Sequence, residues 1–148
     1  MRGDAARAQK MLALGANPGA SLDENSFSCL HLAVMEGHHA CVRALVVARA
    51  DPNAASDSFL SPLTIACVKD HVECVATLLA GGADPSFRPS HIAGSPLEIA
   101  QGHGHTRCAA LIADALSARR RAAHAANAAA VDVELGERQV LPLPHLPT

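Results

Sequence analysis

Aromatic side chains are scarce in this chain, whose 148 residues include three Phe and neither Trp nor Tyr. Proteins that bind single-stranded nucleic acids depend on aromatic rings on which the bases stack. Charge offers no substitute, because 12 Lys and Arg stand against 14 Asp and Glu, and binding to phosphates needs a basic excess. The only basic run is Arg119–Arg121. The composition therefore argues against a nucleic-acid partner.

Long apolar runs are also missing. No stretch reaches the roughly 18 apolar residues that suggest a membrane-spanning helix, and no apolar segment follows Met1–Asp4 as it would in a signal peptide. The five cysteines are odd in number and form no C-x-x-C pair, which is unlike a disulfide framework. We therefore expect reduced thiols, no membrane insertion and an intracellular location, cytoplasmic or nuclear.

The sequence does contain an internal repeat. Segments that begin at Ser28, Ser61 and Ser95 read S-C-L-H-L-A, S-P-L-T-I-A and S-P-L-E-I-A, at spacings of 33 and 34 residues. Two further motifs keep the same phase. A histidine lies ten residues after each serine and a cysteine three residues later, at His38 and Cys41, His71 and Cys74, and His105 and Cys108. The units end in G-A-N-P, R-A-D-P and G-A-D-P, which begin at Gly15, Arg49 and Gly82. Such periodicity indicates a repeat protein.

This pattern resembles the ankyrin repeat over about residues 3–116. The unit from Ser28 to Asn53 matches best, and it departs from the family mainly at Cys29, Val34 and Arg49. The resemblance implies an all-α solenoid of stacked helix-turn-helix units with hairpin-like loops. Its parts would be a half repeat at 3–22, repeats at 23–55 and 56–89, and a terminal repeat at 90–116.

Capping residues predict where the helices begin. Each serine can accept the backbone N–H three residues on, Ser95 and Glu98 form a capping box, and Pro62 and Pro96 stand at the first helical position. The first helix of each repeat is expected at 29–36, 62–69 and 96–103. Second helices are expected at 5–13, 39–48, 72–80 and 106–116.

Each first helix should end in a left-handed residue, at Gly37, Asp70 or Gly104, and Asp70 fits least well because it carries a Cβ. The second helices carry apolar residues on one face, for example Cys41, Val42, Leu45 and Val46. Because a lone helix pair cannot bury that face, neighbouring repeats must stack, with Ala33, Ala66 and Ala100 as small contacts.

The C-terminal part lies outside the resemblance. Residues 117–130 are rich in Ala and Arg and favour an extension of the last helix, whereas 131–148, with three prolines from Pro142 onward, is expected to be disordered. Leu141–Pro144 resembles the cullin-contacting end of a SOCS box, but the upstream Leu-x-x-x-Cys element is missing. A Pro-rich tail is the favoured interpretation.

Metal and catalytic chemistry are not expected. The repeated His and Cys residues are related by a repeat translation, whereas zinc needs four ligands that converge on one point. The sequence contains no G-x-S-x-G, P-loop or H-E-x-x-H motif. We therefore expect no enzyme activity, no cofactor and no metal. Asn53 lies in a context that resembles the hydroxylated asparagine of many ankyrin repeats, although a turn-stabilising role is favoured.

The resemblance implies that a partner protein binds the concave face of the stack, which is made of the loops and the exposed side of the first helices. By position, the expected partner-binding residues are Glu24, Asn25, Phe27, Met35 and Glu36, then Asp57, Ser58, Leu60, Val68 and Lys69, and finally His91, Ile92, Gly94, Gly102 and His103. Alternatively, Phe27, Leu60 and Ile92 pack loop against loop. We expect a monomeric, non-catalytic protein-interaction module or scaffold. Two alternatives stay open: a ubiquitin-ligase adaptor with a degenerate SOCS-box-like tail, and a structural fragment of a larger ankyrin protein.

Overall fold

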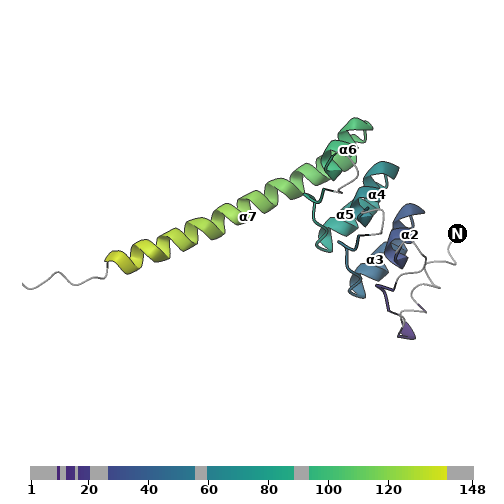
Figure 1. Cartoon of the computed structure of the whole chain (residues 1–148), viewed down its shortest axis with the longest axis horizontal. Helices are drawn as coiled ribbons and strands as arrows, with labels where there is room; N and C mark the ends of the chain where they lie inside the picture. Colours follow the sequence, from purple (N-terminus) through teal and green to yellow (C-terminus); the bar gives the residue numbers. More distant parts are fainter. Residues whose placement is uncertain are drawn as a thin grey trace, which may run out of the picture. The chain divides into compact units, whose positions relative to one another are not determined.

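The computed structural model describes residues 10, 13–15, 17–20, 27–55, 60–88 and 94–139, with side chains to residue 129. The secondary-structure elements in this part of the chain are α-helices (Figure 1). They are α2 (Cys29–Met35), α3 (His39–Val47), α4 (Pro62–Lys69), α5 (Val72–Ala80), α6 (Pro96–Gly102) and α7 (Thr106–Gln139). The predicted all-α class is confirmed. The chain divides into two compact units, Met1–Ala115 and Leu116–Thr148.

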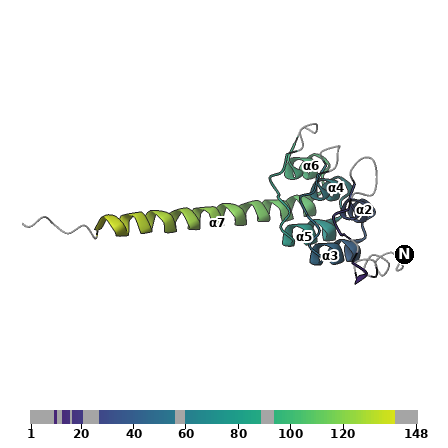
Figure 2. The same ribbon diagram turned by 60° about the horizontal axis from the view of Figure 1, so that its bottom comes forward.

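The helices of the first unit form two layers. Helix α2 contacts α4 and α4 contacts α6, while α3 contacts α5, so first helices pack on first helices and second helices on second helices (Figure 2). Within a repeat, α2 packs on α3 and α4 on α5. This is the predicted stack of helix-turn-helix units.

The predicted caps are present at the starts of α4 and α6. Ser61 Oγ accepts the backbone N–H of Thr64 at 3.2 Å, and Ser95 forms a capping box with Glu98. Pro62 and Pro96 begin α4 and α6, where a missing N–H is not needed. Five of the six helices lie within one residue of their predicted bounds.

Left-handed residues follow the first helices, as predicted. The φ angles are 72° at Gly37, 58° at Asp70 and 74° at Gly104. At Gly37 the glycine is required twice, because an added Cβ would also lie 2.7 Å from Cε1 of the His71 ring in the next repeat. The turn of one repeat therefore packs directly on the turn of the next.

The core is built from small and medium side chains. Leu30, Leu63 and Leu78 are at most 1% exposed. Ala33, Ala66 and Ala100 are buried as expected, which lets neighbouring first helices approach closely. Four of the five free cysteines are buried as well, and burial raises the pKa of the Cys67 thiol to about 12 and that of Cys74 to about 11. These thiols act as small apolar core residues.

Helix α7 ends later than the sequence predicted. It continues to Gln139, whereas disorder was predicted to begin at residue 131. The physical reason is that residues 131–139 contain no proline and include Glu, Leu, Arg and Gln, which have high helix propensity. Residues 117–129 are exposed. None of the described helices, α7 included, is long and apolar enough to cross a membrane.

Several predicted features lie outside the described residues. They are most of the expected helix at 5–13 and the tail at 140–148, which includes Leu141–Pro144 and all three tail prolines.

Candidate functional site

His31 joins the start of α2 to the next repeat. The backbone N–H of Ser28 donates to His31 Nδ1 at 3.2 Å, and the Ser28 hydroxyl lies 2.8 Å from the same nitrogen. The other ring nitrogen, Nε2, lies 3.1 Å from the Leu60 carbonyl oxygen. Because a carbonyl can only accept, Nε2 carries the proton and donates. The ring is 0% exposed, so His31 holds two repeats together and is closed to a substrate.

The equivalent residues in the next two repeats, Thr64 and Glu98, contact the capping serine of their own helix. Thr64 Oγ1 lies 3.0 Å from Ser61 Oγ, and Glu98 Oε2 accepts the Ser95 N–H at 2.7 Å. Glu98 also pairs with Arg88 at 2.9 Å. The Ser95 backbone N–H and then the Arg88 guanidinium hold the pKa of the Glu98 carboxyl below its usual range.

A second joint links the turn after α4 to the start of α7. His105 Nδ1 lies 2.7 Å from the Cys67 carbonyl oxygen and therefore donates to it. The Cys108 thiol donates to Asp70 Oδ1 at 3.2 Å. This contact explains an aspartate where the other repeats have glycine. Burial, followed by the Asp70 contact, raises the pKa of Cys108 to about 12, which leaves the thiol unreactive at neutral pH.

The repeated histidines His38, His71 and His105 stand one per repeat, each immediately before the first residue of a second helix. Among the residues that the structure describes, no group of three or more His, Cys, Asp or Glu side chains could hold a metal ion.

Asn53 bridges two successive loops. Its Nδ2 donates to the Gly82 carbonyl oxygen at 3.2 Å, and its Oδ1 accepts the Asp84 N–H at 2.6 Å. Its own N–H donates to Asp51 Oδ1 at 2.9 Å. The Asn53 side chain therefore links its own loop to the loop of the next repeat, and the hydrogen bond within its own turn is made by the Asp51 side chain.

The described candidates at the ends of the first helices form a row. Met35 with Glu36, Val68 with Lys69, and Gly102 with His103 occupy equivalent positions at the ends of α2, α4 and α6. Glu36, Lys69, Gly102 and His103 are exposed, Val68 is 41% exposed, and Met35 is half-buried. We call these six residues the first-helix row.

Leu32, which the sequence argument missed, lies beside this row. It is 39% exposed and stands three residues before Met35 on α2, hence on the same side of the helix. The signal was available in the sequence, because Leu32 belongs to the repeated S-C-L-H-L-A motif. Its equivalents in the next two repeats, Ile65 and Ile99, are buried, so the repeat by itself does not show that Leu32 is exposed.

Phe27 and Leu60 lie at the joint between repeats. The Phe27 ring meets the His31 ring edge-on, with centroids 5.5 Å apart, and the Leu60 carbonyl oxygen accepts from His31. Both side chains are half-buried, as is Gly94. This geometry favours the alternative in which Phe27 and Leu60 support the stack. The remaining candidates lie outside the described residues: Glu24, Asn25, Asp57, Ser58, His91 and Ile92.

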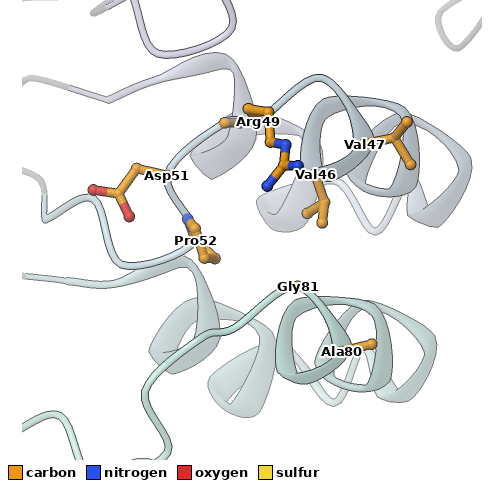
Figure 3. A pocket seen from close by; sticks show the side chains of 8 residues that line it. Val46, Val47, Arg49, Asp51, Pro52, Ala80 and Gly81 are labelled. Carbon is orange, nitrogen blue, oxygen red and sulfur yellow. The ribbon is translucent and has the colours of Figure 1, made fainter.

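A hollow that the sequence did not predict opens at the ends of the second helices (Figure 3). It has a volume of about 460 Å³ and lies between the ends of α3 and α5, with Val46, Arg49, Pro52 and Gly81 among its lining residues. A weak sequence signal was present, because Arg49 replaces the glycine of G-A-N-P and G-A-D-P.

These features define a repeat solenoid. In the part of the chain that the structure describes, its buried polar side chains are hydrogen-bonded, and its candidate sites lie on the surface. A family model described as ankyrin repeats (3 copies) matches residues 1–89 and 30–122. The chain therefore belongs to the ankyrin repeat family.

Solved structures agree with this assignment. The chain is similar to the crystal structure of the human ASB11 ankyrin repeat domain, with 30% sequence identity and a TM-score of 0.68. The match covers 76% of this chain and 50% of that one, so the chain spans half the length of that domain. No curated protein sequence matches the chain.

Proposed function

We propose that this chain is a non-catalytic interaction module that binds a partner protein through the first-helix row and the adjoining loops. The observation that carries the proposal is the repetition of exposed side chains at equivalent positions of α2, α4 and α6. A row of this kind presents one surface that extends along the stack, which suits recognition of another protein.

The chemistry of the row supports a protein partner. Leu32 and Val68 are apolar and partly exposed, and Glu36 and Lys69 add charges of opposite sign beside them. An apolar centre with a polar rim is typical of protein interfaces. With so few repeats, we expect modest affinity.

The interior gives little support for catalysis. In the described part of the chain, every buried side-chain nitrogen and oxygen has a hydrogen-bond partner. The polar groups at the starts of the first helices are thus used by the fold. The free, mostly buried thiols support an intracellular site of action.

The test is affinity purification from cell extract with the wild-type chain and a Val68→Ser, Lys69→Glu variant. Both side chains are exposed, so the variant should keep its unfolding midpoint while losing the specific partners. The matched control is Leu14→Ser, which changes an apolar side chain that is 79% exposed and lies outside the first-helix row, and which should keep those partners. Equal recovery by the wild type and the Val68→Ser, Lys69→Glu variant would refute the proposed surface.

The adaptor alternative rests on the Leu141–Pro144 pattern alone. It requires that elongin and cullin co-purify with the chain and that deletion of residues 141–144 abolishes the cullin contact. Retention of cullin after that deletion would exclude this role for the tail.

A further inference from the structure

The outer side of the second helices carries a continuous groove. The hollow of about 460 Å³ continues into a second one of about 390 Å³, and the two share Val46, Val47, Ala80 and Gly81. Arg49 lines the first hollow and Arg43 the second. We call these six residues the outer groove. It lies on α3 and α5 away from the first helices, because Cys41, Val42 and Leu45 are the α3 residues buried in the stack.

The end of α5 presents its small residues, Ala80 and Gly81, opposite the valines of α3. Ala80 is exposed, and Val46 packs so closely on Gly81 that a Cβ added there would collide with its side chain. Val47 is 76% exposed. An apolar floor is thus left uncovered by the repeats themselves.

Arg49 has a backbone conformation that disfavours its side chain. Its φ is 67°, in the left-handed region, whereas the equivalent positions in the neighbouring units are Gly15 and Gly82, with φ of 85° and 95°. Glycine would adopt this conformation without strain. Strained non-glycine residues tend to occur where the side chain has a function, and Figure 3 shows the Arg49 guanidinium beside Val46, turned toward the groove.

Arg43 and Arg49 carry the positive charge of the groove. Within the described part of the chain, Arg43 and Arg49 make no hydrogen bond or ion pair. The acid that lines the groove, Asp51, accepts the Asn53 N–H, and its carboxylate points away from Val46 (Figure 3). The groove therefore combines an apolar floor with positive charge near both of its ends.

We propose that the outer groove binds a short segment of a partner protein in which apolar residues are flanked by Asp or Glu. The apolar residues cover Val46, Val47 and Ala80, and the carboxylates pair with Arg43 and Arg49, since guanidinium groups bind carboxylates with two parallel hydrogen bonds. This surface is independent of the first-helix row, so one chain can hold two partners at once.

The test is selection of a phage-displayed library of random dodecapeptides on the full chain. Enriched peptides should carry apolar residues flanked by Asp or Glu. Their affinity should fall about tenfold or more in Arg49→Gly and in Arg43→Gln, which is the effect of losing one charge-assisted hydrogen bond. Arg49→Gly is informative because glycine is the residue of the sister repeats and the variant should fold at least as well.

Controls separate this surface from the first-helix row. Lys69→Gln removes a positive charge from α4 and should leave peptide affinity unchanged. The proposal is overturned if no peptides are enriched, if the enriched peptides lack acidic residues, if Arg49→Gly and Arg43→Gln bind them as the wild type does, or if Lys69→Gln abolishes binding.

Discussion

The starts of the first helices and the outer side of the second helices differ in burial and in hydrogen bonding. At the joint around His31, the Ser28 and His31 side chains are buried and each ring nitrogen of His31 has a partner. At the outer groove, Val47 is exposed and Arg49 is strained and unpaired within the described residues. The joint is therefore expected to govern stability, and the groove to contribute little to it.

The largest expected effect is the loss of a core side chain. Leu63 is 1% exposed and lies in the middle first helix. Leu63→Ala should lower the free energy of unfolding by about 2–5 kcal/mol because it leaves a cavity between repeats. Val47→Ala, on the outer groove, should change it by less than about 0.5 kcal/mol. Urea unfolding of both variants measures the contrast, and equal losses would erase the distinction between the two regions.

Removing the His31 ring should have the next largest effect. His31→Ala leaves the Leu60 carbonyl and the Ser28 N–H without their partner, at a cost of about 1–3 kcal/mol. His39→Ala, an exposed histidine at the start of α3, is the control and should be neutral. A thermal unfolding midpoint that is the same for both variants would show that the joint contributes nothing.

Arg49 and Asp70, the two non-glycine residues with a left-handed backbone, allow the groove and the stack to be compared at the same backbone conformation. Arg49→Gly relieves strain and breaks no bond, so it should raise stability by about 0.5–1 kcal/mol. Asp70→Gly relieves similar strain but removes the acceptor of the Cys108 thiol, so its gain should be smaller or absent. Denaturant midpoints compare the two, and a larger gain for Asp70→Gly would show that the thiol contact is not stabilising.

The smallest effect concerns the cap of α6 in acid. The pKa of Glu98 is lowered in the folded chain, so its stabilising contribution is fully present above the usual carboxyl value of 4.5 and is lost as the pH falls through the folded value. Glu98→Gln should therefore be less stable than the wild type at neutral pH and should approach it in acid. Parallel stability curves for the two proteins would contradict this assignment.

The elements of the stack were predictable because they depend on local chemistry. The caps at Ser61 and Ser95, the prolines after them and the turn at Gly37 each act within a few residues, and three in-phase copies reinforce one another. The end of α7 was harder to predict, because residues 131–139 contain no proline and their one glycine, Gly136, does not end the helix.

The outer groove could not be predicted from the pattern. It depends on the approach of Val46 to Gly81 across two repeats, which no single segment shows. The one sequence signal, Arg49 in place of glycine, does not reveal that approach. The joint at Asp70 was missed for the same reason, because its partner Cys108 lies 38 residues away. The first-helix row was placed by family resemblance, and its role in binding stays a prediction.

Hydrogen exchange along the intact chain tests most directly whether the repeats stabilise one another by stacking. Helix α4 packs between two other first helices, so its amides and those of α5 should exchange slowest, while residues 117–129, whose side chains are exposed, should exchange fastest. Uniform exchange along the chain, or stronger protection at 117–129 than in α4, would contradict the account.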